Sequence, residues 1–183
     1  EGEGRDVNRR WMDPIFAGKG SYFEDYQPLD FVGLNIYQPL GYVQNGQEVD
    51  ASTVETQKNS MGWIVDGRCM YWNVKFIYEE YGLPIMITEN GFAANDTVDA
   101  DGQVYDIERE GFIREFISNL KRAADENIPI IGYLHWSVMD NFEWTGGYEP
   151  RFGLIHIDYK TQKRTLKKSA NYYNLRCESV HSA

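Results

Sequence analysis

The chain has 183 residues, of which 42% are hydrophobic and 25% charged, and its formal net charge is −10 at pH 7. This length suits one domain with a hydrophobic core, and the negative charge disfavours nucleic acid, whose phosphates it would repel. No apolar run is long enough to span a membrane and residues 1–5 carry no signal region, so we expect a cytoplasmic protein without a membrane partner.

Three short apolar runs predict β-strands at residues 31–37, 85–89 and 130–136. A helix is predicted between the first two strands, where Met70, Val74, Ile77 and Tyr81 recur at helical spacing before Gly82.

Two further helices are predicted. Between the second and third strands, an apolar stripe precedes Pro129, and its members are Ile113, Phe116, Ile117, Leu120 and Ala124. A last helix is expected over residues 167–177.

The alternation of strands and helices, without a tight hairpin between the main strands, predicts parallel βα units. The long loops follow strands, which suits a (β/α)8 TIM barrel whose active site is built from those loops. A doubly wound sheet is the alternative, and the absence of a glycine-rich phosphate turn after a strand weakens it. A closed barrel needs eight strands and roughly 250 residues, so this chain would be only part of one.

The second strand ends in Thr88, Glu89, Asn90 and Gly91. A carboxylate at the carboxyl end of a parallel strand lies where α/β folds place their chemistry, although for Glu89 alone a solvent-exposed glutamate at a strand end is an equally good interpretation. By the two-residue period of a strand, Asn35 and Tyr37 share a face, and the Tyr37 hydroxyl could orient the Glu89 carboxylate. An ordinary strand tyrosine is the alternative.

The segment after the third strand is rich in aromatic and carboxylate side chains. Residues 135–144 contain Trp136, Asp140, Asn141, Glu143 and Trp144. A sugar pocket uses such residues, because indole rings stack on the C–H face of a sugar while carboxylates and amides bind its hydroxyls. A structural corner with buried tryptophans and turn-capping carboxylates is the alternative interpretation.

Other polar groups suggest no further site. The basic residues of 160–168, Lys167 and Lys168 among them, are expected to form a solvated turn. Cys69 and Cys177 match no metal or redox spacing. The three histidines are scattered, so we expect neither a metal nor an organic cofactor.

Several long motifs resemble glycoside hydrolase family 1, the β-glucosidase family. They are residues 87–91 (Ile-Thr-Glu-Asn-Gly), the segment 136–144, residues 151–154 (Arg-Phe-Gly-Leu), 30–37, 61–63, 159–165 and 169–173. The resemblance covers almost the whole chain. It implies a retaining β-glycosidase on a (β/α)8 barrel, with residues 1–183 forming the C-terminal part, about the last three βα units, of one catalytic domain.

The resemblance also implies roles for individual residues. Glu89 matches the nucleophile and Tyr37 the tyrosine that orients it. The expected sugar-binding residues are Asn35, in the matched segment 30–37, Trp63 at the aglycone entrance, Trp136 beneath the sugar, Glu143 and Trp144 on its hydroxyls, and Phe152 in the same subsite. The expected substrate is a terminal β-glucoside or a related oligosaccharide.

One departure from the family's pattern concerns the second catalytic group. The Thr-Phe-Asn-Glu-Pro-type motif that carries the general acid/base is absent, so we expect it on a missing N-terminal part of the barrel, from the same chain or a second fragment. A non-catalytic sugar-binding or interaction protein that retains the pocket is the main alternative. A thioglucosidase is less favoured, and Glu143 argues against a phospho-β-glycosidase because it would repel a phosphate.

Overall fold

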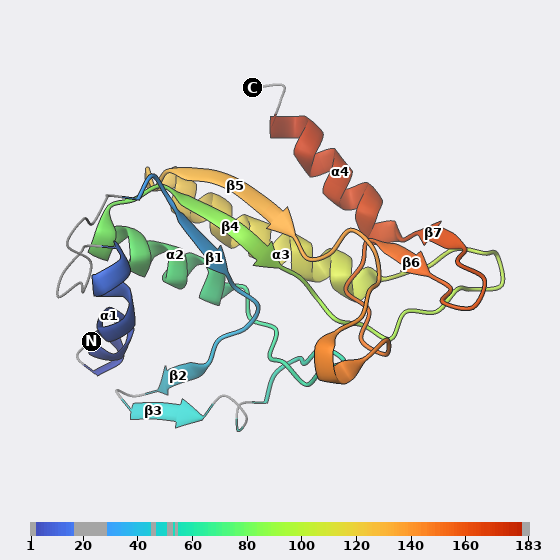
Figure 1. The fold of residues 1–183 in the computed structure, drawn as a ribbon, viewed down its shortest axis with the longest axis horizontal. Coiled ribbons are helices and arrows are strands. Elements are labelled where there is room, and N and C mark those ends of the chain that lie inside the picture. The colour runs from blue at the N-terminus through green and yellow to red at the C-terminus, as the bar shows by residue number, and fades with distance from the viewer. Residues whose placement is uncertain (1–2, 17–28, 45–46, 51–52, 54, 181–183) are drawn as a thin grey trace.

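The computed structural model describes residues 3–16, 29–44, 47–50, 53 and 55–180. Its centre is a three-stranded parallel sheet in the order β1-β4-β5, as Figure 1 shows. The strands are β1 (Val32–Asn35), β4 (Ile85–Asn90) and β5 (Ile130–His135). The three predicted strands are therefore present, and the loops that follow them meet at the carboxyl end of the sheet.

Helices precede, connect and follow the strands. They are α1 (Glu3–Phe16), α2 (Arg68–Tyr81), α3 (Ile107–Asp125) and α4 (Lys168–Val180). Helices α2 and α3 lie side by side behind the sheet in Figure 1, and α4 packs on α3. The expected parallel βα organisation is confirmed for β1-α2-β4-α3-β5.

The core lies between the sheet and helices α2 and α3. Ile85 and Ile87 of β4 are fully buried there, together with Met70 and Val74 of α2 and Phe116 of α3. Helix α2 ends as predicted: Gly82 adopts the left-handed conformation (φ 66°) and its N–H donates to the Tyr78 carbonyl.

Helix α3 begins earlier than its apolar stripe suggested. Phe112 and Ala123 are buried, whereas Ala124, which we expected on the buried face, is exposed. Phe112 stacks on Phe116 at 3.9 Å between ring centroids, so the stripe is rotated toward Phe112. The aromatic pair adds apolar area that the predicted stripe omitted.

Two antiparallel hairpins and helix α1 were not predicted from the sequence. One hairpin pairs β2 (Gly41–Gln44) with β3 (Gln47–Asp50), and the other pairs β6 (Ile155–Ile157) with β7 (Arg164–Leu166). Strands of three or four residues carry too little periodicity to stand out. The Asn-Gly pair at 45–46 is a sequence signal for the first hairpin.

The outer edges of the sheet expose apolar side chains. Phe31, Ile131 and Leu134 are 44%, 54% and 49% exposed. Within the part of the chain that the structure describes, no further strand pairs with β1 or β5 in this sheet. The described helices include none long and apolar enough to cross a membrane.

Candidate active site

The Glu89 carboxylate lies at the carboxyl end of the sheet beside Tyr37. Tyr37 Oη donates a hydrogen bond of 2.7 Å to Glu89 Oε2. The two residues lie on segments that are neighbours in the sheet, because β1 pairs with β4 and the Ile36 N–H donates to the Glu89 carbonyl. The Tyr37 hydroxyl thus holds one carboxylate oxygen, and the orienting contact expected from the sequence is present.

The surroundings of Tyr37 keep its hydroxyl protonated. Burial is the main cause that raises the Tyr37 pKa, followed by the hydrogen bond to Glu89 and the charges of Glu89 and Glu143. All of these disfavour a phenolate. Tyr37 therefore remains a hydrogen-bond donor across the physiological pH range.

Two more predicted residues, Trp63 and Phe152, pack against Tyr37. The ring centroids are 5.5 Å apart for Tyr37 and Trp63, 6.2 Å for Tyr37 and Phe152, and 5.9 Å for Trp63 and Phe152. These rings come from three separate segments of the chain. Phe152 is buried, whereas Trp63 is only partly so. The three rings form an aromatic wall beside the carboxylate, of the kind that a sugar site uses.

Trp136 is held directly against the strand that carries Glu89. Its N–H donates to the Asn90 carbonyl at 2.9 Å. A β-carbon built on Gly91 would lie 1.8 Å from the Trp136 carbonyl oxygen, so only glycine permits this approach. Trp136 is partly buried.

Glu143 and Trp144 differ in their surroundings, although the resemblance pairs them on the same sugar. Glu143 is partly buried, and its N–H donates to the Gly147 carbonyl at 2.6 Å. Trp144 is 81% exposed and has a positive φ of 44°. In the described structure, Glu143 is therefore partly shielded, whereas the Trp144 indole lies in solvent.

Asn35 contacts Thr88, the residue before Glu89. The Thr88 hydroxyl donates to Asn35 Oδ1 at 2.7 Å. The pairing of β1 with β4 is irregular between Leu34 and Asn35, which interrupts the simple two-residue alternation. Asn35 and Tyr37 thus contact successive residues of β4, Thr88 and Glu89.

A buried ion network lies behind these residues, and sequence analysis missed it. The Arg109 guanidinium is fully buried and bonds Asp96 at 2.6 Å and Asp106 at 2.5 Å. It also donates to the carbonyl oxygens of Phe92 and Arg151. A sequence signal was present: the helix dipole disfavours an arginine in the first turn of a helix, so another interaction must stabilise Arg109 there.

Lys167 belongs to the same network, so the expectation of a solvated turn is wrong at this position. Lys167 is fully buried, with Nζ 2.6 Å from Asp96 and 2.7 Å from Asp140. Burial, followed by the charge of Arg109, lowers the Lys167 pKa. A lysine next to polar residues looks solvated in sequence, and only the fold brings two carboxylates to it.

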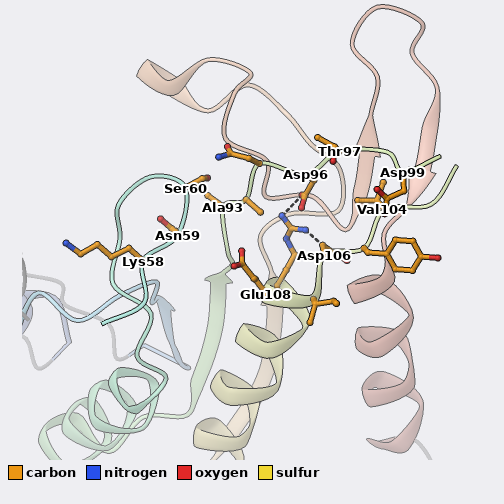
Figure 2. Close-up of a pocket in the computed structure, with 15 residues that line it drawn as sticks. Lys58, Asn59, Ser60, Ala93, Asp96, Thr97, Asp99, Val104, Asp106 and Glu108 are labelled. Carbon is orange, nitrogen blue, oxygen red and sulfur yellow. Dashed lines mark hydrogen bonds and ion pairs between the residues drawn. The ribbon is translucent and has the colours of Figure 1, made fainter. Parts of the chain in front are cut away.

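A separate cavity of about 460 Å³ lies beside this network, and Figure 2 shows residues that line it. It is lined by residues 58–60, 93–97, 99 and 104–109, which include Arg109 and its carboxylate partners Asp96 and Asp106. The eight predicted site residues are not among its lining residues. The cavity is therefore next to, but distinct from, the Glu89 site.

The chain matches a known family over most of its length. The family model described as Glycosyl hydrolase family 1 matches residues 15–180. β-Glucosidase A of Thermotoga maritima is 40% identical over 85% of this chain and 36% of its own length. A 1,4-β-D-glucan glucohydrolase of Thermotoga neapolitana is 41% identical over 81% of this chain and 34% of its own. The chain spans about a third of the length of these curated relatives.

Solved structures agree with the sequence relatives. A family 1 β-glucosidase from Thermotoga maritima superposes with a TM-score of 0.76 at 38% identity, covering 82% of this chain and 35% of that one. The same organism's enzyme in complex with deoxynojirimycin gives a TM-score of 0.80 at 33% identity, covering 91% and 43%. These neighbours are TIM-barrel β-glucosidases, and the family predicted from the motifs is confirmed: the chain belongs to glycosyl hydrolase family 1.

Proposed function

We propose that this chain supplies the nucleophile and much of the sugar pocket of a retaining β-glucosidase. The observation that carries the proposal is the Tyr37–Glu89 hydrogen bond at the carboxyl end of a parallel sheet, in a chain of this family. The aromatic wall formed by Tyr37, Trp63 and Phe152 supports a sugar as the ligand.

In the first chemical step, Glu89 attacks the anomeric carbon of the sugar. Because Oε2 accepts the Tyr37 hydrogen bond, Oε1 is the attacking oxygen. A bond forms between Oε1 and the anomeric carbon as the glycosidic C–O bond breaks, and the leaving oxygen takes a proton from a general acid. The product is a covalent glycosyl-enzyme.

In the second step, water attacks the same carbon. The carboxylate that acted as the acid now accepts a proton from this water, while the hydroxyl binds the anomeric carbon and Glu89 leaves as a carboxylate. Two inversions give net retention of the β configuration. The partly buried Tyr37 hydroxyl remains a donor throughout.

The general acid/base is proposed to lie outside residues 1–183. Retaining hydrolysis needs two carboxyl groups about 5–5.5 Å apart. Asp140 is committed to the buried ion network, and the resemblance assigns Glu143 to sugar hydroxyls. We propose that the remaining strands of the (β/α)8 barrel, with the acid/base on one of them, come from another part of the polypeptide or from a second fragment. Residues 1–183 together with those strands are called the assembled enzyme below.

The expected substrates are terminal β-glucosides or related oligosaccharides. Glu143 is a partly buried carboxylate in the loop after β5 that the resemblance assigns to the sugar, so it can accept hydrogen bonds from sugar hydroxyls, whereas a sugar phosphate would be repelled. This argues against a phospho-β-glycosidase.

Covalent labelling tests the assignment. The assembled enzyme is incubated with cyclophellitol, a glucose-like epoxide, and the digested protein is analysed by mass spectrometry. Because the nucleophile opens the epoxide, the adduct is expected on the peptide that contains Glu89 and is absent in Glu89→Gln. Turnover of an aryl β-glucoside is expected to fall by several orders of magnitude in that variant.

Glu149→Gln is the matched control, because Glu149 is an exposed glutamate in the loop that carries Glu143. It should be labelled like the wild type. An adduct on any residue other than Glu89 would overturn the nucleophile assignment. Binding of deoxynojirimycin without labelling or turnover would instead establish a non-catalytic sugar-binding protein.

A further inference from the structure

The Asp140 carboxylate is the most highly connected acidic group of the loop that follows β5. It is buried, and each oxygen accepts from one cation and one backbone N–H. Oδ1 lies 2.7 Å from Lys167 Nζ and 3.0 Å from the Gly153 N–H. Oδ2 lies 2.6 Å from the Arg151 guanidinium and 3.3 Å from the Ile157 N–H. All four partners lie later in the chain than Asp140.

These contacts close residues 137–157 into a compact loop. The Asp140 N–H donates to the Ile155 carbonyl at 3.0 Å, and the Leu154 N–H donates to the Ser137 carbonyl at 2.9 Å. Gly153 packs so tightly that a β-carbon there would lie 2.1 Å from the Asp140 nitrogen. The loop is therefore fixed at its base by Asp140.

Two sugar-site residues are attached directly to this fixed base. Glu143 follows Asp140 by three residues, and Phe152 precedes Gly153. The Phe152 carbonyl accepts from the Ser137 N–H at 3.1 Å, which holds the buried phenyl ring against Tyr37. A shift of Asp140 would therefore move both Glu143 and Phe152.

The same carboxylate is also connected to the segment that follows the nucleophile. Lys167 bridges Asp140 to Asp96, and Asp96 bonds Arg109. Arg109 in turn donates to the carbonyl oxygen of Phe92, three residues after Glu89. The network thus joins the loop after β4 to the loop after β5 through buried charges.

We propose that Asp140 is a positioning residue that sets Glu143 relative to Glu89 and so determines recognition of the sugar hydroxyls. The proposal rests on the proposed β-glucosidase function. Asp140 does not contact the substrate in this account. It acts by fixing the loop that carries Glu143.

An asparagine at this position would retain the shape and lose the function of the carboxylate. The amide has one acceptor oxygen in place of two, and its NH2 group would face either Lys167 or Arg151. Both cations would lose their shared charge partner in a buried environment, so the loop base would rearrange.

The test measures discrimination between substrates instead of total activity. In the assembled enzyme, kcat/KM for an aryl β-glucoside is divided by kcat/KM for its 6-deoxy analogue. This discrimination ratio does not depend on the fraction of folded enzyme, because both substrates are assayed with the same preparation. In the wild type a ratio of roughly tenfold or more is expected, since a buried acceptor loses its partner. Glu143→Ala should bring the ratio near one.

For Asp140→Asn, the ratio is expected to fall at least about threefold toward the Glu143→Ala value. In the double variant that combines Asp140→Asn with Glu143→Ala, the ratio should be no lower than in Glu143→Ala alone, because both changes act through Glu143. Arg151→Gln is the milder second variant, since it removes one partner of Asp140 from a side chain that is 17% exposed. Its ratio should fall in the same direction by a smaller factor.

Asp66→Asn is the matched control. Asp66 is also a buried carboxylate, but it pairs with Arg68 at the start of α2. Its substitution should leave the ratio unchanged even if less enzyme folds. If Asp140→Asn and Arg151→Gln kept the wild-type ratio while Glu143→Ala changed it, this inference would be overturned and the proposed function would stand. Absence of glucoside hydrolysis by the wild type would overturn the proposed function and the inference with it.

Discussion

The carbonyl oxygen of Trp136 lies so close to Gly91 that a β-carbon on Gly91 would meet it at 1.8 Å. Gly91 follows the Glu89-Asn90 pair, and the Trp136 N–H donates to the Asn90 carbonyl. Strand β4, which carries Glu89, and the segment with Trp136 directly after β5 are thus in direct backbone contact. Their relative position depends on the absence of one methyl group.

Gly91→Ala should therefore displace Trp136 and destabilise the protein. Overpacking of this kind costs about 1–3 kcal/mol, and here the clash is with backbone, which cannot rotate away. Thermal unfolding of the assembled enzyme should show a lower Tm, and kcat/KM for an aryl β-glucoside should fall. The control is Gly111→Ala in helix α3, where a β-carbon meets nothing within 4 Å and stability should be unchanged or higher. Equal Tm values for the two variants would contradict this account.

Tyr37→Phe should reduce kcat without changing the alkaline side of the pH profile. Without the hydroxyl, Glu89 loses its 2.7 Å hydrogen bond, and we expect kcat to fall by roughly 10- to 100-fold. Because burial and the nearby carboxylates raise the Tyr37 pKa, its deprotonation lies above the range in which the enzyme would operate. Measuring kcat/KM from pH 5 to about pH 10 in both forms checks this. An alkaline limb that disappears in the variant would show that Tyr37 titrates there.

Asp96 should contribute to acid sensitivity. Burial acts to raise the pKa of its carboxyl, but Arg109 and Lys167 together hold it below the usual value. A depressed folded-state pKa means stability that is complete above the unfolded value of about 3.9 and is lost as pH falls through the folded-state pKa. The free energy of unfolding of the assembled enzyme, measured with urea, should therefore decrease below about pH 4. In Asp96→Asn the protein should be less stable at pH 7, and this part of the acid dependence should be smaller.

Residues 1–183 expressed alone should not form a stable, active monomer. Three strands cannot close a barrel, and Phe31, Ile131 and Leu134 would remain half exposed along its edges. Size exclusion, near-UV circular dichroism and an aryl β-glucoside assay are expected to show aggregation or self-association, weak tertiary signal and no turnover. A monodisperse, cooperatively unfolding monomer with turnover would contradict both this expectation and the placement of the acid/base outside the chain.

The sequence by itself determined the main strands, the connecting helices and the family. Apolar runs and helical stripes depend on local periodicity, so β4 and α2 could be located without coordinates. The position of Glu89 at the end of a buried strand was visible for the same reason. Long motifs such as 87–91 and 136–144 then indicated which side chains belong to one site.

Only the tertiary structure decided how those side chains meet. Trp144 and Glu143 are neighbours in sequence, yet Trp144 is exposed and Glu143 is partly buried. Lys167 resembled a solvated lysine and is fully buried between Asp96 and Asp140, which lie 71 and 27 positions earlier in the chain. A local pattern reports the polarity of a residue and its immediate neighbours. Burial and pairing of charges depend on contacts between distant segments, and these exist only once the loops after β4 and β5 have folded together.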